Sequence, residues 1–156
     1  MSTAHQPAGA SSIDRAHALS VLRALHDAQN AMYSGGEMDA IRALLTEEIE
    51  WHVPGENAIA GDYHGISEVI DYFHRRRAIA SNTLRLHPEE ILVGATHVAV
   101  LTDGTATFGG VEHRWSTVGL YRLLGNQIAA CWLLALDQDA FDRAWAPHHA
   151  PAPRTT

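Results

Sequence analysis

Apolar side chains recur every three or four positions in three stretches of the chain, which is the spacing of a helix with one buried face. The first stretch predicts a helix over residues 12–34, and the Gly35–Gly36 pair ends it. Two shorter helices are predicted over residues 37–45 and 66–80. The apolar stripe of the first helix consists of Ala18, Val21, Leu22, Leu25, Ala28 and Met32.

Three polar side chains follow the same helical spacing beside that stripe. His26, Gln29 and Tyr33 lie at the border of the buried face of the first helix. They are therefore candidates to line any space that this helix covers.

Five other segments have the apolar pattern of strands, with glycine, asparagine or proline between most of them. These segments are residues 48–53, 84–93, 96–108, 111–124 and 127–136. Between the first strand and the third helix, residues 56–65 are predicted to be a glycine-punctuated loop, and Asp137 begins a short last helix. Helices segregated from a run of antiparallel strands indicate an α+β fold. A curved sheet packed over three helices leaves a concave space for a small ligand.

Composition bounds the possible functions. The chain has 156 residues, a net charge of −7 and one cysteine, so we predict a single domain without an internal disulfide. Residues 12–146 form that domain, and residues 1–11 and 147–156, which have no periodicity, are predicted to be disordered tails. We expect a cytoplasmic protein that binds neither nucleic acid nor a membrane, because it is acidic and has no signal peptide or long apolar segment.

All 11 cationic residues are arginine, and three of them are consecutive. Arg75, Arg76 and Arg77 come near the end of the third predicted helix, where positive charge complements the helix dipole. That role is the one we predict for them, in preference to a functional patch.

Several short motifs, together with the order of elements, resemble the nuclear transport factor 2-like superfamily, and most closely its SnoaL-like and ketosteroid-isomerase-like members. The motifs are Trp51-His52-Val53-Pro54-Gly55, Gly61-Asp62-Tyr63-His64-Gly65, Val118 to Leu123, and Asp137 to Asp142 with Trp145. The resemblance implies a cone-shaped α+β barrel, in which a curved, mostly antiparallel sheet wraps over three helices and encloses a hydrophobic cavity. It also implies a homodimer that pairs through the outer face of the sheet. The fold hosts isomerases, cyclases, hydrolases, dehydratases and binding proteins, so it does not name the reaction.

The catalytic sets of two enzyme groups of this fold are not matched. Where steroid isomerases have an aspartate base, this chain has Val53, and their tyrosine donor aligns with Gln29. Their second donor falls near Gly119. The Asp-Arg-Asp set of the epoxide hydrolases falls near Gly104, Ala106 and Leu133. Steroid isomerisation and epoxide opening in their known forms are therefore disfavoured.

Strand alternation, combined with the family alignment, assigns the side chains that face the cavity. Trp51 and Val53 face inward on the first strand, so His52 faces outward. On the later strands the inward positions are Thr102, His113, Trp115, Thr117 and Leu133. Tyr33 completes the set of predicted substrate-binding residues. Trp51 serves equally well as a cavity wall and as core packing.

Three polar side chains are the candidates for catalysis. His113 is a candidate general acid or base, because an unperturbed histidine has a pKa near 6.5. Gln29 is placed to orient a carbonyl oxygen, and His26 is the third candidate. For His113 the alternative is a structural ring that hydrogen-bonds a threonine or the backbone.

The leading hypothesis is a SnoaL-like enzyme that carries out acid–base chemistry of the isomerase or polyketide-cyclase type, without a cofactor, on a hydrophobic carbonyl-bearing substrate. The alternative is a non-catalytic member that binds a small ligand or a partner. We predict no metal site, because no zinc-binding motif is present and alternation points His52 away from the cavity.

Overall fold

The computed structural model describes residues 13–149. The predicted tail of residues 1–11 and all but the first three residues of the predicted tail 147–156 lie outside this range. Residues Pro147–His149 form a 3₁₀ turn, so the described chain continues past the predicted end of the domain.

The helices begin and end close to where the apolar spacing places them. They are α1 (Arg15–Tyr33), α2 (Asp39–Ala43), α3 (Ile66–Ile79) and α4 (Gln138–Ala144). Asp14 caps α1 by accepting hydrogen bonds from the backbone N–H groups of Ala16 and His17. None of the helices among the described residues is both long and apolar enough to cross a membrane.

The strands form one six-stranded sheet in the order β2-β1-β6-β5-β4-β3. Their bounds are β1 (Leu45–Val53), β2 (Gly61–His64), β3 (Arg85–Val93), β4 (Val98–Phe108), β5 (Val111–Leu124) and β6 (Gln127–Ala135). All neighbouring pairs are antiparallel except β1 and β6, which run parallel. The prediction of a mostly antiparallel α+β fold is confirmed.

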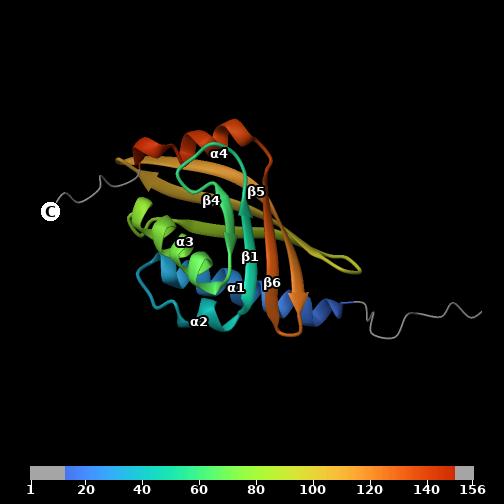
Figure 1. Ribbon diagram of the computed structural model, residues 1–156. Helices are drawn as coiled ribbons and strands as arrows, with labels where there is room; N and C mark the ends of the chain where they lie inside the picture. The colour runs from blue at the N-terminus through green and yellow to red at the C-terminus, as the bar shows by residue number, and fades with distance from the viewer. Residues whose placement is uncertain (1–12, 150–156) are drawn as a thin grey trace, which may run out of the picture.

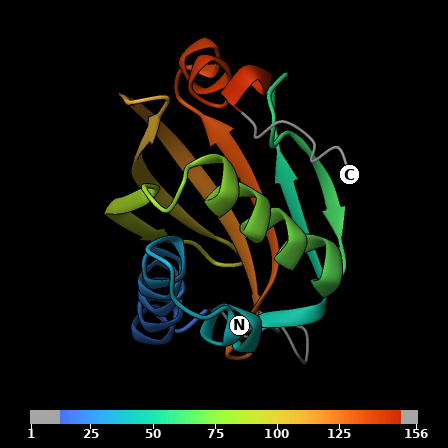
Figure 2. The same ribbon diagram turned by 90° about the vertical axis from the view of Figure 1, so that its left-hand side faces the viewer.

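The sheet curves around α1 and α3, which lie on its concave side. Figure 2 shows α1 beside β3 and α3 crossing in front of β1, while α4 covers one end of the sheet. In Figure 1 the sheet is open, because β2 and β3 at its two edges do not meet. The hydrophobic core fills the space between the helices and the sheet, and its largest fully buried side chains are Trp51, Trp145, Tyr33, Tyr72, Phe73 and Phe141.

Two local predictions were wrong. Residues 61–64, predicted as part of a loop, form β2 and pair with β1, for example Tyr63 with Trp51. Leu45, predicted as the end of a helix, begins β1 and pairs with Ile128 of β6. In both cases pairing with a neighbouring strand decides the local structure, and the sequence pattern of so short a segment does not contain that information.

The long β4–β5 ladder fixes which side chains face the helices. Val100 pairs with Gly119, Thr102 with Thr117, Gly104 with Trp115, and Ala106 with His113. Because both members of a directly opposed pair point to the same face of a sheet, these pairs form a row along the concave side. That row is the floor on which the candidate site is built.

Candidate functional site

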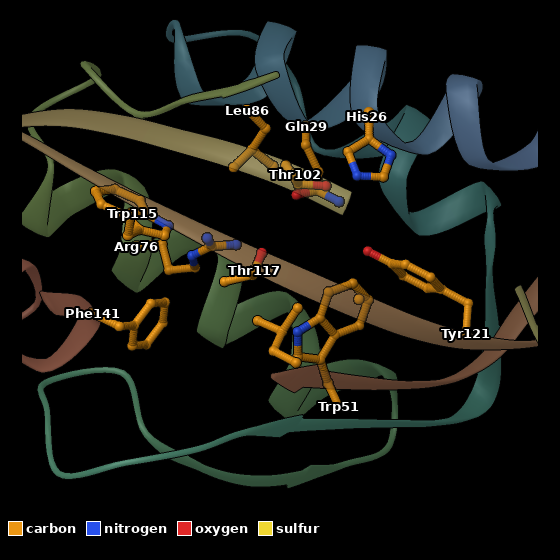
Figure 3. A pocket seen from close by; sticks show the side chains of 12 residues that line it. His26, Gln29, Trp51, Arg76, Leu86, Thr102, Trp115, Thr117, Tyr121 and Phe141 are labelled. Carbon is orange, nitrogen blue, oxygen red and sulfur yellow. The ribbon is translucent and has the colours of Figure 1, made fainter. Parts of the chain in front are cut away.

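A cavity lies between α1, α3 and the concave face of the sheet. Its wall contains two of the three predicted catalytic residues, His26 and Gln29. It also contains five of the predicted binding residues, which are Trp51, Thr102, Trp115, Thr117 and Leu133. Figure 3 shows the labelled side chains of this set entering from α1, from β1 and from the β4–β5 row, and Leu133 belongs to β6.

The cavity is narrow. About 380 Å³ among the lining side chains is free of protein atoms, but the centre of a water-sized molecule can reach only about 20 Å³ of it. A single water needs about 10–15 Å³ by that measure. By that measure the cavity as it stands holds roughly one or two waters, so any ring-sized ligand requires the lining side chains to move apart, and a compact ligand requires the smallest displacement.

His26 is held in one orientation by α1 itself. Its Nδ1 lies 2.7 Å from the carbonyl oxygen of Leu22, one turn earlier. Since a carbonyl only accepts, Nδ1 carries the proton and the Nε2 lone pair is free. The ring is 2% exposed, and burial lowers its pKa more than the Leu22 hydrogen bond raises it. His26 is therefore neutral at pH 7, with a basic nitrogen at the cavity.

Gln29 follows His26 on the same face of α1 and is also buried, at 1% exposure. In Figure 3 its side-chain amide lies beside Thr102, and Thr117 approaches from the neighbouring strand. Among residues 13–149, none of these three side chains has a hydrogen-bond partner within the protein, so their donors and acceptors remain available to a ligand.

Tyr121 is a cavity residue that the sequence analysis missed. Its hydroxyl points into the cavity toward His26 in Figure 3, and the two rings meet edge-on with centroids 6.3 Å apart. Burial raises the pKa of Tyr121 well above its ordinary value, so the hydroxyl keeps its proton. The ring lies where Gly119 has no side chain, since a Cβ there would fall 2.8 Å from the Tyr121 hydroxyl oxygen. Tyr121 has the same strand parity as Thr117 and Gly119, and this alternation could have indicated from the sequence that it faces the cavity.

Arg76 is the second residue that was missed, and its predicted role at the helix end is incomplete. Its side chain is 4% exposed and lines the cavity, whereas its neighbour Arg75 is exposed. Nη1 of Arg76 donates a 2.8 Å hydrogen bond to the Tyr33 hydroxyl. Tyr33 was predicted to line the cavity wall. It does not, but it supports Arg76, which does. Arg76 follows Val69 and Phe73 at helical spacing, so the apolar pattern of α3 could have indicated its burial.

Two other predicted site residues lie away from this cavity. His113 is on the inward face of β5, but it is beyond the end of the cavity and packs beside Phe108 and His149, at ring-centroid distances of 5.4 and 5.3 Å. Its pKa is lowered by partial burial and by the two neighbouring histidines at 148 and 149. Val53 is buried at the end of β1, opposite Gly61. Alternation predicted the face of each residue correctly, but it does not predict how far the cavity extends.

The outer face of the sheet holds a separate polar cluster. His52 points outward, as predicted, and its Nδ1 lies 2.7 Å from a carboxylate oxygen of Asp62. Its ring stacks on Trp132 and meets His64 edge-on, with the two imidazole centroids 5.9 Å apart. Within residues 13–149, no group of three or more histidine, cysteine, aspartate or glutamate side chains has a metal-binding arrangement.

Comparison with known proteins identifies the family to which this chain belongs. The family model described as "SnoaL-like domain" matches residues 22–131, which is well over half of the chain. No curated protein matches the sequence.

Solved structures share the fold at low sequence identity. Bal32a, from a soil-derived mobile gene cassette, superimposes with a TM-score of 0.77 at 21% identity, over 83% of this chain and 97% of that one. An NTF2-like protein from Burkholderia xenovorans LB400 gives 0.68 at 18% identity, over 88% and 99% of the two chains. A putative ketosteroid isomerase from Kribbella flavida gives 0.62 at 14% identity, over 78% and 79%. These likenesses confirm the predicted nuclear transport factor 2-like fold.

Proposed function

Because the chain belongs to the SnoaL-like domain family, we propose that it is a small-molecule enzyme that carries out acid–base chemistry in the cavity between α1 and the sheet. Its substrate is a hydrophobic carbonyl compound, its reaction is of the isomerase or cyclase type, and it uses no cofactor. One observation carries this proposal. His26 is neutral, is fixed by the Leu22 carbonyl, and presents its free Nε2 to an otherwise mostly apolar cavity.

The chemistry begins with removal of a proton from the carbon next to the substrate carbonyl. Nε2 of His26 takes the proton, and the electrons of the C–H bond form an enolate whose negative charge rests on the carbonyl oxygen. The amide of Gln29 and the hydroxyl of Tyr121 are the neutral donors available to that oxygen, and a buried site makes such donors effective. The imidazolium of His26 then returns the proton to a different carbon in an isomerisation. In a cyclisation the enolate carbon attacks a second carbonyl, and the imidazolium protonates the alkoxide that forms, which regenerates the neutral base.

The first half of this cycle can be tested without knowing the natural substrate. Proton removal in D₂O exchanges hydrogen for deuterium beside the carbonyl, and NMR follows the loss of the proton signal. We expect the protein to accelerate exchange in small aryl ketones above the buffer rate. His26→Asn keeps an N–H able to reach the Leu22 carbonyl but removes the base, so exchange should fall by roughly a hundredfold or more.

His17→Asn is the matched control, because His17 is on the same helix and its ring contacts the Gly125 carbonyl rather than the cavity. It should exchange deuterium at the parent rate. Exchange that is equally fast in the His26 and His17 variants would refute a catalytic role for His26. Ketones that bind without exchange would favour the alternative, a binding protein of the same fold.

A further inference from the structure

Arg76 is a buried cation without an anionic partner. It donates a hydrogen bond to the Tyr33 hydroxyl of α1 and lies against the rings of Tyr33, Tyr72 and Trp145, whose centroids are 5.3–5.5 Å from the guanidinium carbon. No carboxylate among residues 13–149 lies within ion-pair distance of it. Aromatic faces and one hydroxyl oxygen offset part of the cost of burying this charge, but they do not neutralise it.

Several buried hydrogen-bond donors in the same region have no acceptor. Within the part of the chain that the structure describes, four buried side-chain atoms lack any partner: Nε of Arg76, the indole Nε1 atoms of Trp51 and Trp145, and the Tyr72 hydroxyl. The three nitrogens only donate. Trp51 and Arg76 both line the cavity, and Trp145 and Tyr72 lie against the guanidinium. A native interior normally satisfies such groups, so these donors call for acceptor oxygens that the protein does not place beside them.

One edge of the guanidinium has no partner among the described residues, and the Nε on that edge is buried rather than open to the cavity. Nη1 is engaged by Tyr33, whereas neither Nε nor Nη2 has a hydrogen-bond partner among the described residues. That pair of nitrogens is the edge that binds the two oxygens of a carboxylate in a bidentate manner. In Figure 3 the guanidinium reaches in from α3 beside Thr117, while His26 and Tyr121 enter from the other side of the cavity.

We propose that the cavity binds a compact organic carboxylate, with its carboxylate group on Arg76 and its apolar body extending toward His26. The inference rests on the proposed function, because it names the class of substrate for the same cavity. Because the cavity is narrow, the lining side chains must move apart to admit even a single ring, and a polycyclic molecule would require a larger displacement. An oxo acid of this kind places its carbonyl between the guanidinium and the base.

Binding is tested first, with benzoate and its neutral isostere benzamide as probes, by isothermal titration calorimetry on the full chain. The two molecules have nearly the same shape, so a difference reports the charge. We expect benzoate to bind at least tenfold more tightly than benzamide. Equal affinities, or no binding of benzoate, would overturn the proposal without the need for any variant.

Two variants then assign the effect to Arg76. Arg76→Gln should remove the preference for benzoate, whereas Arg75→Gln, a substitution at the exposed neighbouring position, should keep it. If Arg76→Gln does not fold, Arg76→Lys retains the charge but loses the bidentate edge, and benzoate should then bind several-fold more weakly than to the parent. Retention of the full preference in a folded Arg76 variant would contradict the assignment.

Deuterium exchange separates this inference from the proposed function. Phenylpyruvate and phenylacetone share a benzylic CH₂ beside a ketone, and only the former carries a carboxylate. Faster enzyme-dependent exchange in phenylpyruvate, lost in Arg76→Gln, supports both proposals. If both ketones exchange equally fast and the exchange depends on His26 but not on Arg76, the proposed enzyme function is supported and the proposed carboxylate site is refuted. Selective binding of benzoate without exchange in either ketone leaves the carboxylate site standing and refutes the enzyme.

Discussion

The substitution Gly104→Ala tests whether the indole ring of Trp115 fills the space beside Gly104 in the cavity wall. Gly104 lies directly opposite Trp115, and the indole ring of Trp115 occupies the space that a side chain at 104 would fill. An added Cβ would fall 2.4 Å from the Cε2 and Nε1 atoms of that ring. Ordinary contact requires about 3.5–4.0 Å, so the ring must move by about 1 Å or more.

The ring has little room to move. Trp115 is 6% exposed and packs edge-on against Trp145 and Phe141, with ring centroids 5.3 and 6.3 Å away. Overpacking of this kind costs about 1–3 kcal/mol. The lower backbone entropy of alanine in the unfolded chain offsets about 0.5–1 kcal/mol of that cost. The free energy of unfolding should therefore fall by about 1–2 kcal/mol, which lowers the melting temperature by roughly 2–8 °C.

Urea unfolding followed by tryptophan fluorescence measures this loss, and a double-mutant cycle isolates its cause. Trp115→Leu removes the ring atoms that the new Cβ would meet, so Gly104→Ala in that background should be neutral or slightly stabilising. An equal loss of stability in both backgrounds, or none in the parent, would show that the indole does not constrain position 104.

Four further outcomes can be checked. Burial lowers the pKa of His26, so the unfolded chain binds a proton more readily, and stability should fall as pH drops below about 6.5. His26→Asn should weaken that dependence and leave the part that comes from His113, whose pKa is also lowered. Burial also acts to lower the pKa of His52, but its hydrogen bonds to Asp62 and Glu50 outweigh this and raise it, so NMR should show the two histidines titrating on opposite sides of the ordinary value. Burial raises the pKa of the Cys131 thiol, so iodoacetamide should label it only after unfolding, and labelling of the native protein would contradict its placement. The predicted homodimer should show twice the chain mass by light scattering at about 100 µM, well above a micromolar dissociation constant, and a monomeric mass would count against it.

The fold could be predicted because local signals and tertiary packing agree over long segments. Residues 15–33 carry a clear apolar stripe, and the segments that form β4 and β5 are long and separated by the Gly109–Gly110 turn. The short strand β2 has four residues, all at least partly exposed, and therefore no burial pattern to detect. Its structure comes from pairing with β1, which only the three-dimensional arrangement supplies.

The site was partly predictable for a similar reason. Strand parity correctly assigned Thr102, Trp115 and Thr117 to the cavity wall, because all three lie in the middle of the β4–β5 ladder. The same parity placed His113 there as well, although it lies closer to the end of the ladder than Trp115 does. Parity specifies the face of a sheet, whereas the extent of a cavity depends on where helices and loops close it. Here that closing contact comes from Phe108 and residues 147–149.

The role predicted for Arg76 was incomplete because the sequence analysis assigned one role to all three consecutive arginines. Three consecutive arginines near a helix end were all predicted to complement the helix dipole, yet successive residues of a helix point about 100° apart, so a run of three cannot share one environment. Arg76 lies three residues after Phe73 and therefore on the buried face, while Arg75 turns outward to donate to the Ala58 carbonyl. An arginine on an apolar helix face is costly unless something in the interior accepts its hydrogen bonds, and Tyr33 accepts only one. The charge that remains is best explained by an anionic ligand, and this is why Arg76, rather than His113, is the residue with which a search for the substrate should begin.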